Sequence, residues 1–79
     1  MYSYNISDIA NKKDFEKACR AIEKEVKVTE KENLLEDVDG TLIQIYHTND
    51  GKIKVFNDYE VDAVYVDSEI IINSFEKAS

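Results

Sequence analysis

Apolar and polar residues alternate at the start of the chain, and this pattern predicts a strand. Tyr2, Tyr4 and Ile6 alternate with serine and asparagine, which is the period-two pattern of a half-buried β-strand. From Asn11 onward the period changes to that of a helix, because the apolar residues fall on a single helical stripe. This stripe consists of Phe15, Ala18, Cys19, Ile22 and Val26. Asn11, with Asp14 three residues further on, is expected to cap the helix at its N-terminus.

The middle of the chain predicts a β-hairpin. Residues 42–46 and 52–56 form β-rich runs with a period of two, and Asn49-Asp50-Gly51 lies between them. Glycine and asparagine tolerate the positive φ that tight hairpin turns need. Residues 61–66 form a third run, which is apolar on both faces at its end, as in a central strand. We expect this third strand to pair with the neighbouring strand of the hairpin.

Two further segments carry weaker patterns. Thr29 and Glu32 repeat a capping-box pattern ahead of a pair of leucines, which predicts a short second helical turn. The last segment, residues 69–79, is compatible with a final strand or with a helix that begins at Ser68. Its three consecutive isoleucines favour the strand, because β-branched residues are preferred in strands.

Together these elements predict an α+β fold. It is a two-layer sandwich in which an antiparallel meander of three or four strands packs against one main N-terminal amphipathic helix. With 79 residues, no proline and two glycines, the chain has room for one domain and contains no linker. We therefore expect residues 1–79 to form a single small acidic domain.

The cysteine content and the N-terminus favour the cytoplasm. Cys19 is the only cysteine, so an internal disulfide is excluded and a reducing compartment is favoured. The first residues lack the basic start and the apolar run of a signal peptide. The longest apolar run has four residues, 63–66, which is far shorter than a membrane-spanning segment of about 20 residues. A cytoplasmic protein without membrane contact is therefore expected.

No pattern in the sequence predicts catalysis or metal binding. His47 is the only histidine, and no nucleophile or second base accompanies it. Cys19 lies within the helical apolar stripe, which favours a core position. Asp37-Val38-Asp39-Gly40 resembles the start of a calcium loop, but the alignment places Leu35 and Tyr46 at the first and twelfth ligand positions. Without a phosphate-binding, metal-binding or nucleophile motif, we predict no enzymatic activity, no cofactor and no metal.

Acidic residues are concentrated in the second half of the chain. The protein has 17 acidic and 10 basic residues, a net charge of −7. Residues 11–33 hold seven basic and six acidic side chains, whereas residues 34–79 hold three basic and ten acidic ones. This charge opposes binding to nucleic acid or to an anionic membrane, and it favours a basic protein partner.

The densest acidic stretch predicts a row of carboxylates. If this stretch is extended, Asp58, Glu60 and Asp62 share one face at intervals of about 6.6 to 6.8 Å. Tyr59, Val61, Ala63 and Tyr65 would then point toward the core. The predicted partner-binding residues are Asp58, Glu60, Asp62, Asp67, Glu69, Glu36, Asp37, Asp39 and Tyr59.

Such a row of carboxylates can take the place of nucleic-acid phosphates. We therefore expect a non-enzymatic module that occupies the basic surface of a larger protein, such as a nucleic-acid enzyme. In size and charge the chain is similar to the small acidic inhibitors of phages and mobile elements, including anti-CRISPR and antirestriction DNA mimics. This likeness is one of class and covers no individual residues.

Two alternatives use the same charge differently. In one, the protein is a housekeeping or accessory subunit, or an adaptor, that binds a partner through its sheet edge. Acidity then serves only solubility, because acidic edges also discourage aggregation between strands. An enzymatic role would have to fall on His47 or Cys19. The sequence leaves open whether the protein is a monomer or a homodimer.

Overall fold

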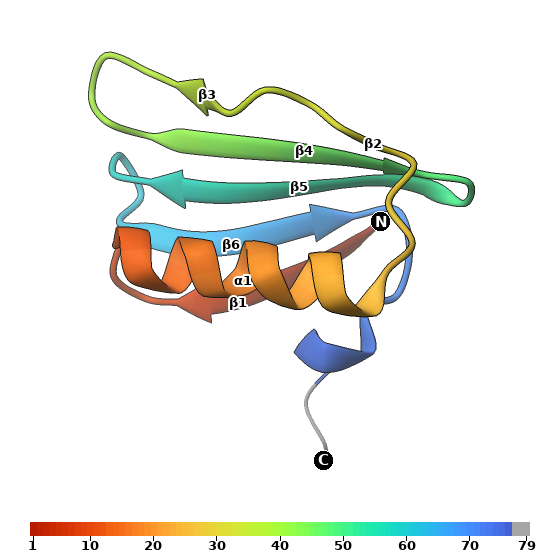
Figure 1. The fold of residues 1–79 in the computed structure, drawn as a ribbon. Helices are drawn as coiled ribbons and strands as arrows, with labels where there is room; N and C mark the ends of the chain where they lie inside the picture. The colour runs from red at the N-terminus through yellow and green to blue at the C-terminus, as the bar shows by residue number, and fades with distance from the viewer. Residues whose placement is uncertain (77–79) are drawn as a thin grey trace.

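An antiparallel sheet with one long helix across one of its faces forms the described part of the chain, residues 1–76 of a computed structural model (Figure 1). The elements are β1 (Tyr2–Ser7), α1 (Lys12–Glu25), β2 (Glu30–Lys31), β3 (Leu35–Glu36), β4 (Leu42–Thr48), β5 (Gly51–Asp58), β6 (Ala63–Ser68) and the short 3₁₀ helix η1 (Asn73–Phe75). The predicted α+β fold is confirmed. The sheet has six strands rather than three or four.

The strand order explains the extra strands. Strands β4, β5 and β6 form the predicted meander, and β1 pairs with β6 to give the order β1-β6-β5-β4-β2. The two-residue strands β2 and β3 both pair with β4. Since β1 and β2 lie at opposite edges, the chain crosses the sheet between them, and α1 makes this crossing.

Helix α1 begins and packs as the sequence predicts. The side chain of Asn11 accepts a hydrogen bond from the Asp14 N–H at 2.8 Å, which satisfies one free donor of the first turn. Phe15, Ala18 and Ile22 are buried against the sheet. They meet a layer of apolar side chains from β1, β4, β5, β6 and the C-terminal segment: Tyr4, Leu42, Tyr46, Ile53, Val55, Val64, Val66 and Ile72.

The helical turn predicted near residue 30 is wrong. The segment forms β2 instead, and the N–H groups of Thr29 and Glu32 bond to the carbonyls of His47 and Ile45 on β4. A short capping pattern stabilises an isolated helical turn only weakly. Backbone pairing with the open edge of β4 therefore determines the local structure.

The strand favoured for the C-terminal segment is also wrong. Strand β6 ends at Ser68, whose hydroxyl accepts the Ile70 N–H. Ile72 is buried, and its N–H donates to the Tyr4 hydroxyl. The adjacent strand β6 already pairs with β1 and β5, so the segment cannot extend the sheet beside β6. Residues 77–79, the end of the segment whose strand or helix character the sequence left open, lie outside the described residues.

Candidate functional site

The acidic stretch after β5 is a turn, so its predicted row of carboxylates is wrong. Residues 59–62 connect β5 to β6. The Asp58 carboxylate accepts hydrogen bonds from the N–H groups of Glu60 and Val61, which folds the backbone into a turn. Asp62 completes the turn with a left-handed φ of 56°, a conformation that aspartate tolerates. Tyr59 and Val61, predicted to face the core, are 48% and 63% exposed.

The fold nevertheless brings most of the predicted acids to one end of the sheet. Strands β4 and β5 are antiparallel, so the loop before β4 lies beside the turn after β5, and Leu42 pairs with Asn57. The β1–α1 loop joins them, because the Ala10 N–H donates to the Asp62 carboxylate at 2.9 Å. These three loops lie at the left end of the sheet in Figure 1. We call this region the acidic end; it contains Asp8, Glu36, Asp37, Asp39, Asp58, Glu60 and Asp62.

Asp67 and Glu69 lie elsewhere. Both belong to the other end of β6, on the face of the sheet opposite α1. Asp67 accepts a hydrogen bond from the Ser3 hydroxyl at 2.8 Å. Glu69 accepts one from the Lys52 N–H at 2.7 Å. The predicted grouping of these two residues with the other acids is therefore wrong.

Several carboxylates of the acidic end hold loop backbone in place. Asp39 accepts the Thr41 N–H at 3.0 Å, and this bond holds the pKa of Asp39 below its usual value. Asp37 accepts the Val38 N–H, in addition to the bonds of Asp58 and Asp62 described above. These aspartates have a structural role whether or not they bind a partner. Glu36 and Glu60 are exposed and accept no loop hydrogen bond of this kind among residues 1–76.

Tyr59 lies among these acids with its ring exposed. Its N–H donates to the Thr41 hydroxyl at 3.3 Å. Its ring packs over Gly40, close enough that an added Cβ at Gly40 would lie 3.5 Å away. An aromatic side chain held in this way can act as an anchor in a protein interface.

A hollow of about 400 Å³ adjoins Tyr59 at the acidic end. Its lining consists of Lys12, Leu34, Glu36, Asp39, Gly40, Leu42, Asn57 and Tyr59. Asn57 is fully buried, and among the described residues neither its amide nitrogen nor its amide oxygen has a hydrogen-bond partner. Burying an unpaired amide costs about 1–3 kcal/mol, and this cost falls on a residue that lines the hollow.

Replacing Asn57 with leucine is expected to raise the free energy of unfolding by ~1–2 kcal/mol. Leucine keeps the branched shape of the amide and removes its unpaired polar atoms. Urea unfolding of the purified variant measures the change. A lower stability than that of the wild type would mean that the amide is hydrogen-bonded in solution or that the bulkier leucine side chain does not fit.

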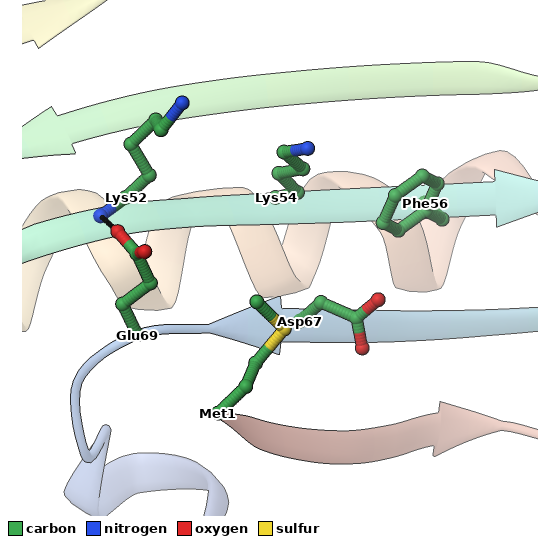
Figure 2. A pocket seen from close by; sticks show the side chains of 6 residues that line it. All are labelled: Met1, Lys52, Lys54, Phe56, Asp67 and Glu69. Carbon is green, nitrogen blue, oxygen red and sulfur yellow. Dashed lines mark hydrogen bonds between the residues drawn. The ribbon is translucent and has the colours of Figure 1, made fainter.

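The face of the sheet opposite α1, which we call the open face, is covered by no other element among residues 1–76 (Figure 2). Ile43, Phe56 and Tyr65 are neighbours across β4, β5 and β6 on this face, and all three are half-buried. The rings of Phe56 and Tyr65 are stacked, with centroids 4.7 Å apart. Beside them is a pocket of about 210 Å³ that is lined by Met1, Lys52, Lys54, Phe56, Asp67 and Glu69.

Sequence reasoning missed the open face, although a signal was present. Residues 42–46 carry apolar side chains at both phases of the alternation. Leu42 and Tyr46 face the helix, which leaves Ile43 and Ile45 on the open face. A strand that is apolar on both faces is typical of a sheet covered on both sides, so this pattern indicated a second covered face.

No family model, curated protein or solved structure matches this chain. Its function therefore has to be inferred from its own surfaces. Among residues 1–76, no His, Cys, Asp and Glu side chains gather in a group of three or more that could hold a metal ion. The same residues contain no helix with the length and apolar character needed to cross a membrane.

An enzymatic role would depend on His47 or Cys19, and both side chains make contacts within the fold. The His47 ring is partly exposed and contacts the Glu32 carboxylate. Cys19 packs against the core, and burial raises the pKa of its thiol. A raised pKa keeps the thiol protonated, which is the less nucleophilic form.

Proposed function

We propose that the protein is a non-enzymatic binding module that uses its acidic end to occupy a basic surface of a larger protein in the cytoplasm. One observation carries the proposal: three loops and the strand ends that lead into them bring seven carboxylates to one end of a small sheet. Among residues 1–76, the basic side chains at this end are Lys12 and Lys13, at the start of α1. Their effect is outweighed by the carboxylates.

The expected binding mode follows from the charges. A compact group of carboxylates attracts a basic surface over about a Debye length, ~8–10 Å at physiological salt, and so speeds association. Tyr59 then supplies an apolar contact in the middle of the charged group. A surface that binds nucleic-acid phosphates is a suitable partner surface, because carboxylates can replace phosphates as acceptors for lysine and arginine.

The test reverses charge only where the fold does not depend on it. Glu36→Lys with Glu60→Lys changes two exposed acids, whereas Asp58 and Asp62 hold the turn and are left intact. Glu30→Lys with Asp50→Lys makes the same change in net charge at the opposite end of the sheet, where both residues are exposed. The tagged wild type and both variants are incubated with lysate of the source cells. Bound proteins are eluted at ~0.5 M salt and quantified.

We expect salt-eluted basic proteins to be retained by the wild type and by the Glu30/Asp50 variant, and to fall at least tenfold with the Glu36/Glu60 variant. Excess heparin, a polyanion, is expected to compete with the wild type for the same proteins. Equal retention by both variants, or the absence of any salt-eluted protein, would contradict the proposal.

A second candidate is an adaptor that binds through a sheet edge. One observation favours it: β1 pairs with β6 on one side, and no strand of residues 1–76 covers its other side. Strand addition depends on backbone hydrogen bonds and side-chain pockets, which salt screens little. A partner that stays bound at ~0.5 M salt to both charge-reversal variants would support this candidate.

A further inference from the structure

The open face carries opposite charges in neighbouring columns. Lys52 and Lys54 extend from β5, whereas Asp67 and Glu69 lie along β6 and just beyond it (Figure 2). Lys54 and Asp67 are register partners, and the Glu69 N–H donates to the Lys52 carbonyl at 2.9 Å. Each lysine therefore lies at nearly the same height along the strands as one acid.

Within residues 1–76, neither Lys52 nor Lys54 forms an ion pair. Among the described residues, ion pairs within 4.0 Å join only Lys31 to Glu23 and His47 to Glu32. Lys52 and Lys54 are exposed, and their side chains rise from β5 without reaching the carboxylates of β6 (Figure 2). Next to these charged residues, Phe56 and Tyr65 are the following pair of neighbours across β5 and β6 on the open face.

We propose that two copies of the protein pack their open faces together about a two-fold axis that runs parallel to the strands, midway between β5 and β6. Such a rotation places β5 of each copy over β6 of the other and leaves the height along the strands unchanged. Lys54 then faces Asp67 of the second copy, and Lys52 faces Glu69. Phe56 faces Tyr65 of the second copy. Every contact occurs twice, as in an isologous interface.

The charges select this axis over the other one available to stacked sheets. A two-fold axis across the strands at the level of Ile53 would place β5 over β5 and set Lys52 against Lys54. The parallel axis instead pairs the lysines of β5 with the acids of β6 in the second copy, and it extends the stack of Phe56 and Tyr65.

The size of the open face predicts a reversible dimer. With a spacing of ~4.8 Å between strands and a rise of ~3.3 Å per residue, the face covers on the order of 500 Å² per copy. Two such faces reach the lower limit of specific interfaces, roughly 1,000 Å² in total. We therefore expect association at micromolar rather than nanomolar concentration.

The parallel axis has a consequence for the rest of the molecule. Because it preserves direction along the strands, the acidic ends of both copies lie at the same end of the dimer. The dimer does not depend on the proposed function, since its test is the mass in solution. If only the dimer proposal fails, the protein stays at the monomer mass but still retains salt-eluted proteins. If only the proposed function fails, the protein dimerises but retains none.

The experiment measures mass by sedimentation equilibrium over a concentration range of about 1 to 500 μM. We expect the wild type to move from the monomer mass of 9.1 kDa toward twice that value. Lys52→Glu with Lys54→Glu, and Asp67→Lys with Glu69→Lys, each create like-charge contacts across the axis. Each of these variants is expected to remain monomeric alone, while an equimolar mixture of the two forms a heterodimer.

The mixture separates an interface effect from misfolding, because rescue requires both variants to be folded. Lys24→Glu, on the exposed side of α1, is the control and is expected to dimerise like the wild type. A wild type that stays at the monomer mass throughout overturns the proposal. A dimer that both open-face variants retain also overturns it, since the contact must then lie elsewhere. Circular dichroism shows whether the variants fold. If neither does, Lys54→Ala replaces them, and we expect it to weaken association tenfold.

Discussion

Replacing Ile22 with alanine is expected to lower the free energy of unfolding by ~2–5 kcal/mol. Ile22 lies on the buried face of α1 and is 0% exposed. The change removes its methyl groups from the core and leaves a cavity between the helix and the sheet. A domain of 79 residues has a total stability of ~4–12 kcal/mol. The loss is therefore a large fraction of the whole, and α1 is the only long helix that covers this face of the sheet in the described residues.

Urea unfolding followed by circular dichroism measures this effect. Ile9→Ala is the matched control, because it makes the same change at a residue that is 65% exposed. Its cost is expected to stay within ~0.5 kcal/mol. Similar losses in both variants would mean that α1 does not pack on the sheet as described.

The elements that the sequence predicts well are specified by neighbouring residues. The start of α1 depends on Asn11 and Asp14, three positions apart, and its buried face depends on one apolar stripe. The β4–β5 hairpin depends on Asn49-Asp50-Gly51 between two alternating runs. In each case, the physical cause of the structure lies within about a dozen residues, so it is visible in the sequence.

The prediction of an extended row after β5 is wrong because the turn there lacks the glycine or proline that usually marks a turn. Residues 58–62 contain neither glycine nor proline, and their alternation of acidic and apolar residues fits a strand as well as a loop. The turn depends on the left-handed conformation of Asp62 and on the hydrogen bonds that Asp58 accepts. Either aspartate could equally be an exposed strand residue, and only the pairing of β5 with β6 decides between the two.

The position of the acidic end depends on contacts between distant residues. Ala10 and Asp62 are 52 positions apart, yet their hydrogen bond joins the β1–α1 loop to the β5–β6 turn. This neighbourhood follows from the pairing of β1 with β6, which no local pattern indicates. Asp8 was missed for that reason. Asp67 and Glu69 lie away from the other acids because β6 is extended from Ala63 to Ser68, which places them at its far end.

Replacing Gly51 with alanine is expected to destabilise the protein by ~2–4 kcal/mol through two separate costs. Gly51 opens β5 with a φ of +150°, which residues with a side chain rarely adopt. A Cβ at this position would also lie 2.7 Å from the Cβ of Glu69, which is too close for two carbon atoms. Relieving this clash requires β5 to move away from the segment after β6. The movement would weaken the hydrogen bond from the Lys52 N–H to the Glu69 carboxylate.

Gly40→Ala separates the two costs, because alanine at Gly40 has the cost of a positive φ without a clash of its Cβ. Gly40 has a φ of +89°, and its added Cβ would meet the Tyr59 ring at an ordinary contact distance of 3.5 Å. Its cost is expected to be ~1–2 kcal/mol. Urea unfolding of both variants gives the comparison, and hydrogen exchange at the Lys52 amide localises the effect. Equal losses at the two glycines would show that Glu69 does not press against the start of β5, and the pairing of Lys52 with Glu69 on the open face would have to be redrawn.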